Sequence, residues 1–506
     1  MTHVRGRALV LAWAVVIGAS GCRSDSATGP SAPVQLLYRS DSAIGPTQAI
    51  SGRVINSGRV DVFGNFPAAV RVAIADASGR TVTSATDMVT IALAAGSPGG
   101  ATLSGTLTVP AIQGLATFSN LSIGQTGTGY RLIATSGTLT SSTSDAFDVA
   151  VPMPAATQVA AGGIWACALT SAGSYCWGHD GGGELGINDS ISRATPYPVL
   201  TGGATYSQVT AGYNETCAVT AAGAAYCWGH NRYGGAGDGT SGMKRFVPTP
   251  VSGSHVFTKL SDGYETGCGV TLSGAIYCWG HNDAGQIGNG TTNDATVPDS
   301  VHAPATFASV SAGWSYACAL STLGAPSCWG SNTRGNLGDG TLTDRSTPVS
   351  VTGGPYVFSA ITTGDHQTCA LRASDGAAFC WGSNSNGQLG DGTMTDRRAP
   401  VAVSGGKFFS AITAGSTHTC GIEKTTRLAY CWGWNMYGQL GDGTTTDRST
   451  PTAVSGGHAF VSLSGGDIQT CGVASTGTVY CWGNNSEGGL GNGTSNPSNT
   501  PAAVTP

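Results

Sequence analysis

The stretch FCWGSNSNGQLGDGT, residues 379–393, recurs along the chain with small changes. Near-copies end in GQLGDGT at 438–444 and in GNLGDGT at 335–341, and each follows a cysteine placed directly before a tryptophan. That cysteine is the second of a pair, and the first members of successive pairs lie 50 or 51 residues apart. Internal repeats of this length are typical of solenoids and propellers. The seven pairs are Cys167 and Cys176, Cys217 and Cys227, Cys268 and Cys278, Cys318 and Cys328, Cys369 and Cys380, Cys420 and Cys431, and Cys471 and Cys481.

Each copy has the pattern of four short strands separated by turn residues. In the sixth copy we place them at 399–403, 409–413, 419–422 and 428–432. Four antiparallel strands per unit, repeated seven times, favour a β-propeller, in which radial repetition leaves few exposed sheet edges. The first copy lacks a leading strand, and a spare strand at the end of the chain follows the last copy. We therefore expect the tail strand to complete the first sheet and to close the ring.

The repeated motif Trp-Gly-x-Asn-x-x-Gly-Gln-Leu-Gly-Asp-Gly-Thr resembles the RCC1 (regulator of chromosome condensation) repeat, in its bacterial, cysteine-bearing form. The resemblance covers residues 156–506 and implies a seven-bladed propeller. The first copy departs most from the motif, because Gly-Ile-Asn-Asp at 186–189 replaces Gly-Asp-Gly-Thr.

The N-terminus has the features of an export signal, which we assign to residues 1–21. Arg5 and Arg7 precede an apolar run at 8–18 that is too short to span a bilayer. The small residues before Cys22 resemble the lipobox of bacterial lipoproteins, which implies cleavage before Cys22 and lipidation of its thiol. An ordinary secretory signal with an incidental cysteine is the alternative. Either interpretation predicts an exported protein, anchored in the bacterial cell envelope by the lipid or else secreted.

The next segments read as a polar tether at 22–33 and a β domain at 34–150. The β domain has no cysteine and alternates apolar and polar residues between turns, as at 70–75 and 115–121. It resembles bacterial immunoglobulin-like domains, which implies a β-sandwich that holds the propeller away from the membrane. A linker at 151–155 precedes the propeller domain at 156–506. The predicted fold class is therefore all-β throughout.

The paired cysteines predict disulfides within each repeat. Both members flank a hairpin turn, so they can lie opposite each other on adjacent strands with both side chains on one face. An oxidising compartment would keep such bridges formed. Zinc binding and free buried thiols are the alternatives, although the C-x2-C spacing of common zinc sites is absent.

The copies differ most in two loops that should emerge at the same end of every blade. These loops carry aromatic residues in the early copies and polar residues in the later ones. Trp and Tyr dominate binding hot spots. We predict a partner-binding face, with packing of these aromatics on neighbouring blades as the alternative. The predicted contact residues are Trp165, Tyr213, Tyr264, Trp314, Tyr316, His366, His418 and Trp434.

Two metal sites are alternatives to this binding face. His179, His230 and His281 stand at equivalent positions in adjacent copies, and imidazoles suit zinc or nickel. Asp391 and Asp396 could share a calcium ion, although Asp before Gly more often forms a turn by bonding its own backbone. We expect turns, and no metal or other cofactor.

Composition narrows the function. Charged residues make up 10% of the chain and the formal net charge is -5, so the composition does not indicate a basic surface for binding nucleic acid. No nucleophile elbow, zinc-protease motif or phosphate loop is present. We expect a monomeric, non-enzymatic scaffold that binds a protein or glycan at the cell surface and meets the membrane only through its lipid. The alternatives are inhibition of a secreted enzyme, as in the similar β-lactamase inhibitory proteins, guanine-nucleotide exchange, and a lyase activity on the propeller face.

Overall fold

The computed structural model describes residues 35–39, 59–61, 69–76, 79–123, 127–144, 147–150 and 153–505. Cys22, with the predicted signal and tether, lies outside the described residues. The chain divides into two compact units, which are described separately. The first includes Ala68–Leu121 and Tyr130–Ala146, and the second includes Ser122–Gly129 and Phe147–Pro506. In the described part of the chain, no helix has the length and apolar character needed to cross a membrane.

The N-terminal unit is built from short antiparallel strands. One sheet has the order β1-β3-β7, from Gln35–Arg39, Val70–Ala75 and Leu115–Phe118. A second has the order β11-β10-β4-β6, from Ser142–Thr143, Leu132–Thr135, Met88–Leu93 and Thr108–Pro110. Strand β4 alternates exposed and buried residues, which places Val89 and Ile91 in the core. The strands predicted at 70–75 and 115–121 correspond to β3 and β7, and the immunoglobulin-like assignment stays a prediction.

The remaining strands of this part of the chain are short. A three-stranded sheet has the order β2-β12-β9, in which β2 and β12 are parallel. The bounds of these strands and of two further strands are β2 (Arg59–Asp61), β12 (Phe147–Ala150), β9 (Gly127–Tyr130), β5 (Leu103–Ser104) and β8 (Ser122–Ile123).

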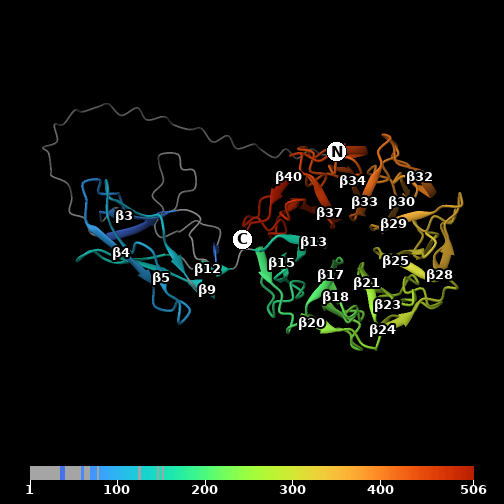
Figure 1. Cartoon of the computed structure of the whole chain (residues 1–506), viewed down its shortest axis with the longest axis horizontal. Coiled ribbons are helices and arrows are strands. Elements are labelled where there is room, and N and C mark those ends of the chain that lie inside the picture. The colour runs from blue at the N-terminus through green and yellow to red at the C-terminus, as the bar shows by residue number, and fades with distance from the viewer. Residues whose placement is uncertain are drawn as a thin grey trace, which may run out of the picture. The chain divides into compact units, whose positions relative to one another are not determined.

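Seven four-stranded antiparallel sheets follow one another around a ring, the arrangement of a β-propeller (Figure 1). Strands pair in chain order within every sheet, from β13-β14-β15-β16 to β37-β38-β39-β40. The first strands of neighbouring sheets adjoin around the ring, and β13 adjoins β37. These first strands are β13 (Ala156–Ala161), β17 (Tyr206–Ala211), β21 (Phe257–Asp262), β25 (Phe307–Ala312), β29 (Phe358–Thr363), β33 (Phe409–Ala414) and β37 (Phe460–Gly465).

The second and third strands form the hairpin that carries each cysteine pair. The second strands are β14 (Trp165–Thr170), β18 (Glu215–Thr220), β22 (Thr266–Thr271), β26 (Tyr316–Ser321), β30 (Gln367–Arg372), β34 (His418–Glu423) and β38 (Gln469–Ala474). The third strands are β15 (Gly173–Gly178), β19 (Ala225–Gly229), β23 (Ile276–Gly280), β27 (Pro326–Gly330), β31 (Ala378–Gly382), β35 (Ala429–Gly433) and β39 (Val479–Gly483). The fourth strands are β16 (Arg193–Pro198), β20 (Arg245–Pro250), β24 (Ala295–Ser300), β28 (Arg345–Ser350), β32 (Arg397–Ala402), β36 (Arg448–Ala453) and β40 (Ser498–Ala503).

The expectation that the tail strand completes the first sheet is wrong. Strand β40 pairs with β39 in the last sheet, and the first sheet has its own fourth strand, β16. The strand assigned to the start of the sixth copy, at 399–403, corresponds to β32, which pairs with β31 of the fifth sheet. The long loop after Cys-Trp-Gly therefore returns the chain to the sheet that it has just left.

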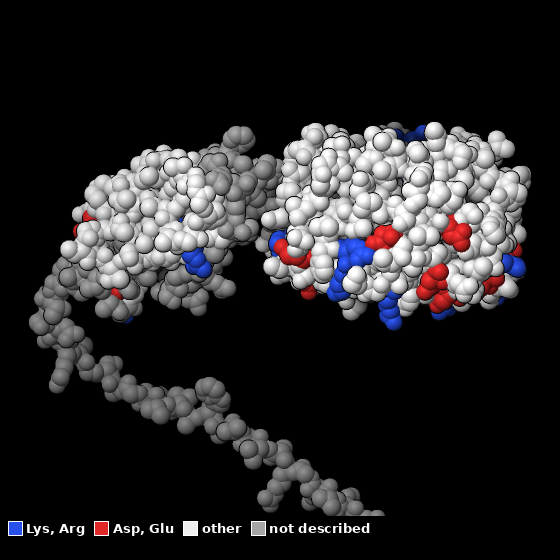
Figure 2. Space-filling model, turned by 90° about the horizontal axis from the view of Figure 1, so that it is seen from below, with Lys and Arg blue, Asp and Glu red and all other residues white. Residues whose placement is uncertain are grey.

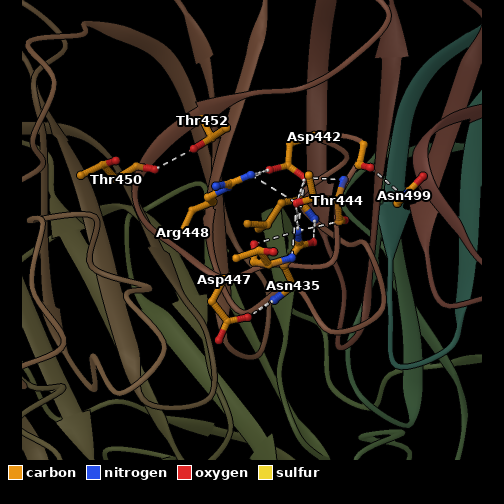
Figure 3. A network of polar contacts seen from close by, with 11 residues as sticks. Asn435, Asp442, Thr444, Asp447, Arg448, Thr450, Thr452 and Asn499 are labelled. Carbon is orange, nitrogen blue, oxygen red and sulfur yellow. Dashed lines mark hydrogen bonds and ion pairs between the residues drawn. The ribbon is translucent and has the colours of Figure 1, made fainter.

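A polar network fixes the shape of that loop, as Figure 3 shows for the sixth sheet. The Asn435 side-chain amide donates to the main-chain oxygens of Thr444 and Thr446, both at 3.1 Å. Asp442 accepts from the N–H of Thr444 at 2.9 Å and from Nε of Arg448 at 2.8 Å. Burial raises the pKa of Asp442, but these hydrogen bonds outweigh it and leave that pKa below its ordinary value. The Gly-Asp-Gly segment is thus a turn, as predicted for Asp before Gly.

The fifth sheet repeats this network, so Asp391 and Asp396, the pair considered for calcium, accept hydrogen bonds from the chain itself. Asp391 accepts from Thr393 and Arg397, and Asp396 accepts from the Asn384 N–H at 2.8 Å. Ion pairs of this type put opposite charges side by side. On the face that Figure 2 shows, much of the propeller wall is uncharged, and most of its charged residues lie in the half toward one rim. The aspartates of the motif therefore hold loops in place.

The cysteines of each pair stand directly opposite each other on the second and third strands. Cys369 and Cys380 are register partners with Cα atoms 4.1 Å apart, and the structure bonds them. The same bond joins the other six pairs, within the sheets predicted.

The tryptophan after each second cysteine packs between sheets. The seven residues are at most 1% exposed, and six of them donate from Nε1 to a main-chain oxygen of the preceding sheet. Trp381, for example, donates to Asn336 O at 3.0 Å. A glycine with positive φ makes room for each indole: a Cβ on Gly390 would lie 2.7 Å from Nε1 of Trp432. The Cys-Trp-Gly motif thus combines a staple within one sheet with a contact to its neighbour.

Candidate binding site at the end of the propeller axis

The turn between the first and second strands brings one loop from every sheet to the propeller axis. Three consecutive residues from each of the seven sheets line a single cavity of about 90 Å³. The middle residue is always glycine, whereas the third residue varies. The seven third residues are Gly163, Tyr213, Tyr264, Trp314, Asp365, Ser416 and Asp467.

Main-chain hydrogen bonds between neighbouring loops position these residues. Tyr213 N donates to Gly263 O at 3.0 Å, and Asp467 N donates to Gly162 O at 3.1 Å across the junction of the last and first sheets. The glycines are required because the loops approach closely. A Cβ on Gly364 would lie 2.2 Å from the main-chain oxygen of Gly415. The repeated scaffold therefore holds these seven residues, six of them with side chains, around one axis.

Aromatic rings form one side of the cavity. Tyr264 and Trp314 stack with ring centroids 4.0 Å apart and an interplanar angle of 16°. Tyr213 lies 5.3 Å from the Tyr264 ring and 5.1 Å from the Trp314 ring, at steeper angles. All three side chains are half-buried. Offset and edge contacts of this kind fix the positions of the rings.

Carboxylates form the other side. Burial, together with the nearby charge of Asp467, raises the pKa of Asp365 to about 7. Burial likewise raises the pKa of Asp467, and a hydrogen bond with the Ser416 hydroxyl lowers the pKa of both groups. Among the described residues that line the cavity there is no Lys, Arg or His. The cavity thus joins an aromatic wall to carboxyl groups that have no cationic neighbour among the described lining residues.

A third carboxylate, Asp262, also lines the cavity and is 7% exposed. Burial raises its pKa well above the ordinary value, opposed by the N–H groups of Gly212 and Gly263. Neither of those contacts has normal hydrogen-bond geometry, so both carboxylate oxygens of Asp262 lack a hydrogen-bond partner among the residues that the structure describes. Asp262 was not predicted from the sequence. Its signal was available, because the last residue of the first strand is small or a threonine in the other six sheets: Ala161, Ala211, Ala312, Thr363, Ala414 and Gly465.

Three of the predicted contact residues are buried between sheets, and their assignment to a binding face is wrong. Trp165 and Tyr316 are 1% exposed and His418 is 0% exposed. Each stands two residues before a first cysteine, so it points to the same side of its strand as that cysteine. Their polar atoms bond the next sheet: Trp165 Nε1 donates to Thr216 Oγ1 at 3.1 Å, and Tyr316 donates its hydroxyl to Gln367 O at 2.6 Å.

The other five predicted residues divide into two groups. Tyr213, Tyr264 and Trp314 come together at the cavity. His366 and Trp434 are half-buried, but neither is among the residues lining the cavity. Burial lowers the pKa of His366, and Trp434 packs edge-on against Tyr437 with ring centroids 5.5 Å apart. The variable loops thus supply some residues that line the axial cavity and others that lie outside it.

The three histidines considered for metal binding do not form a cluster. His179 Nδ1 lies 3.9 Å from Glu487 and His230 Nε2 lies 3.5 Å from Glu184, each on the preceding sheet. His281 stacks on Tyr233 with ring centroids 4.1 Å apart. In the part of the chain that the structure describes, no three His, Cys, Asp or Glu side chains are placed so as to hold a metal ion.

Comparison with known proteins identifies the repeats. Residues 270–506 match the model of the RCC1-like domain, and residues 206–234 match that of the regulator of chromosome condensation (RCC1) repeat. The repeats within these ranges are similar to RCC1 repeats. The ultraviolet-B receptor UVR8 of Arabidopsis thaliana is 32% identical over 339 residues, which are 65% of this chain and 65% of the receptor. The probable E3 ubiquitin-protein ligase HERC4 of Homo sapiens is 29% identical over 253 residues, 49% of this chain but 19% of the ligase. The RCC1-like part therefore spans less than two thirds of each relative.

Solved structures support the same fold. Human WBSCR16 superposes with a TM-score of 0.59 at 19% identity, covering 66% of this chain and 93% of that one. Prp20p of Saccharomyces cerevisiae superposes with a TM-score of 0.57 at 19% identity, covering 65% of this chain and 85% of that one. Prp20p has binding properties toward Gsp1p and histones. At these identities the likeness establishes the fold alone.

Proposed function

We propose that this protein is an exported, envelope-anchored and non-enzymatic binding protein that recognises a partner through the axial end of its RCC1-like propeller. The observation that carries the proposal is the contrast between repeated and variable positions. Cysteines, tryptophans and turn glycines recur in the seven sheets as scaffold, whereas the third loop residue differs and gathers at one cavity. Conformationally restricted aromatic side chains next to a polar rim are typical of binding hot spots.

Protein binding by similar propellers supports a protein partner. Prp20p, which shares the fold, binds the proteins Gsp1p and histones, and it has also been crystallised with Kap60 bound. A lyase would be favoured by a carboxylate–histidine cluster, and no histidine stands among the described residues that line the cavity. Export and lipid anchoring rest on the sequence around Cys22 alone.

Site-specific photo-crosslinking in the host cell tests the binding proposal. A photoreactive phenylalanine at position 314 stands at the cavity, and the same group at Leu323, which is 83% exposed on the turn between β26 and β27, is the matched control. A defined adduct at 314 that is absent at 323 supports the proposal. The same adducts at both positions, or none at either, contradict it.

The anchor needs a separate test. Cys22→Ala should abolish incorporation of labelled fatty acid and release the protein from the membrane fraction. Unchanged membrane association would contradict lipid anchoring and leave the binding proposal to the crosslinking experiment.

A further inference from the structure

We propose that the axial cavity binds the positively charged end of a lysine or arginine side chain carried by the partner. This inference rests on the proposed function and names the chemistry that the site recognises. It follows from three properties of the cavity: its uncompensated carboxylates, its aromatic wall and its size.

The carboxylates of the cavity differ from the aspartates of the repeated Gly-Asp-Gly motif. Motif aspartates such as Asp339 and Asp442 each contact an arginine, at 2.9 Å and 2.7 Å. In contrast, no ion pair to Asp365, Asp467 or Asp262 is present among the described residues, although all three line one cavity. Buried charges are normally paired, so this cavity lacks a cation of the kind that the motif aspartates receive from their own chain.

The aromatic wall favours an organic cation over other ligands. Ammonium and guanidinium groups are attracted to the faces of Trp and Tyr, by about 0.5–2 kcal/mol depending on desolvation. Tyr213 contacts both other rings, and its pKa is raised by burial and by the charges of Asp467 and Asp365. A cation in the cavity would therefore meet π faces on one side and carboxylates on the other.

The size of the cavity limits what can enter. A cavity of about 90 Å³ has room for the end of a side chain. A bare metal ion would require a compact set of oxygen or nitrogen ligands, and no such set is present among the described residues.

The decisive experiment is a binding titration of the full-length protein with short peptides, read by intrinsic fluorescence and by calorimetry. Gly-Gly-Lys-Gly-Gly should bind saturably, and the same peptide with acetyl-lysine should bind at least tenfold more weakly. Free n-butylammonium distinguishes the source of the cation, because a partner side chain predicts that the lysine peptide binds at least as tightly as the free amine. Calcium chloride should not compete. Equal binding of the lysine and acetyl-lysine peptides, tighter binding of the free amine, or displacement by calcium would overturn the proposal.

Variants of the lining residues test whether the lysine peptide binds in the cavity. The double variant Asp365→Asn with Asp467→Asn should weaken lysine-peptide binding at least tenfold, and Trp314→Leu should weaken it severalfold. Asp283→Asn is the matched control, because Asp283 is an exposed carboxylate outside the cavity, with 68% side-chain exposure. A variant is compared only where its near-ultraviolet circular dichroism and melting temperature match those of the wild type. Unchanged affinity in a folded double variant would overturn the proposal.

The same double variant separates this inference from the proposed function. If a partner crosslinks at position 314 and the double variant leaves that adduct unchanged, the cation inference is wrong and the binding function stands. If no partner crosslinks while the lysine peptide binds, the cavity has the proposed chemistry and the proposed partner function fails.

Discussion

Trp177 of the first sheet donates a hydrogen bond from Nε1 to the main-chain oxygen of Gly489 in the seventh sheet, at 3.0 Å. This bond closes the ring with the same contact that joins other neighbouring sheets, for example Trp381 with Asn336. Two further contacts cross the same junction: Gln469 Nε2 donates to Trp165 O at 2.7 Å, and Ala161 N donates to Ser464 Oγ at 3.0 Å. The first and last sheets are therefore joined by side-chain and main-chain contacts and share no strand.

The tryptophan contacts predict that replacing Trp381 lowers the free energy of unfolding more than replacing Trp432. Trp381→Phe should lower the free energy of unfolding through lost packing and through a lost hydrogen bond to Asn336 O, a further cost of about 0.5–1.5 kcal/mol because Thr368 Oγ1 still donates to that oxygen. Trp432 is equally buried, but its Nε1 has no hydrogen-bond partner among the described residues, so Trp432→Phe should cost less. Urea unfolding of both variants measures the difference, and equal costs would contradict the assigned role of the hydrogen bond.

The disulfides predict a second stability effect. Each closes a loop of 9 to 11 residues, which in the chain-entropy model contributes about 2–3 kcal/mol. Replacing Cys369 and Cys380 together by serine should therefore lower the melting temperature, and reduction should lower that of the wild type further. Non-reducing peptide mapping should yield seven bridges, each within one repeat. Free thiols on the folded, exported protein would show that the pairs are reduced.

Glu215 predicts a stabilising substitution. It is 1% exposed, neither carboxylate oxygen has a hydrogen-bond partner within the described part of the chain, and burial together with the charge of Asp262 raises its pKa well above the ordinary value. The seventh sheet has Gln469 at this position, and its amide donates to the main chain of the next sheet. Glu215→Gln should therefore allow the equivalent bond to Thr266 O and stabilise the protein by about 1–3 kcal/mol at neutral pH. The control is Glu487→Gln on an exposed side chain, and a loss of stability in Glu215→Gln alone would contradict the assignment.

The acidic side of the cavity predicts a pH dependence of stability. The pKa of Asp365 is raised to about 7, first by burial and then by Asp467, so between about pH 4 and pH 7 the folded chain binds more protons here than the unfolded chain. This contribution to the free energy of unfolding is fully present below the unfolded pKa and is lost as the pH rises through 7. Asp365→Asn should therefore lose less stability than the wild type between pH 5 and pH 8. Parallel stability curves of the two proteins would contradict the raised pKa.

The sequence was sufficient for the repeat, the hairpins and the pairing partners of the cysteines, because these depend on local spacing. It was insufficient for the boundary of each sheet. Strand β32 (Arg397–Ala402) follows its long loop and could begin one sheet or end another, and the network around Asp391 decides this by returning the chain to β31. In the first copy the altered loop concealed strand β16, which led to the incorrect expectation for the tail strand.

The binding site was predicted in part for a related reason. Tyr213, Tyr264 and Trp314 were identified by their position in a variable loop, but Trp165, Tyr316 and His418, only two residues further along equivalent loops, were grouped with them. The two-residue period of a strand directs these three side chains into the contact between sheets. The burial of Asp262 and Glu215 required the ring itself, because the residues that enclose them come from neighbouring loops and sheets.

The most direct test of cation recognition follows the Trp314 indole N–H in the full-length protein labelled with ¹⁵N-tryptophan, assigned by comparison with Trp314→Phe. On titration with the Gly-Gly-Lys-Gly-Gly peptide, we expect a saturable shift of the Trp314 resonance while those of the buried Trp381 and Trp432 stay in place. A Trp314 resonance that does not move at saturating peptide, or that moves equally with the acetyl-lysine peptide, would contradict recognition of a cation at the propeller axis.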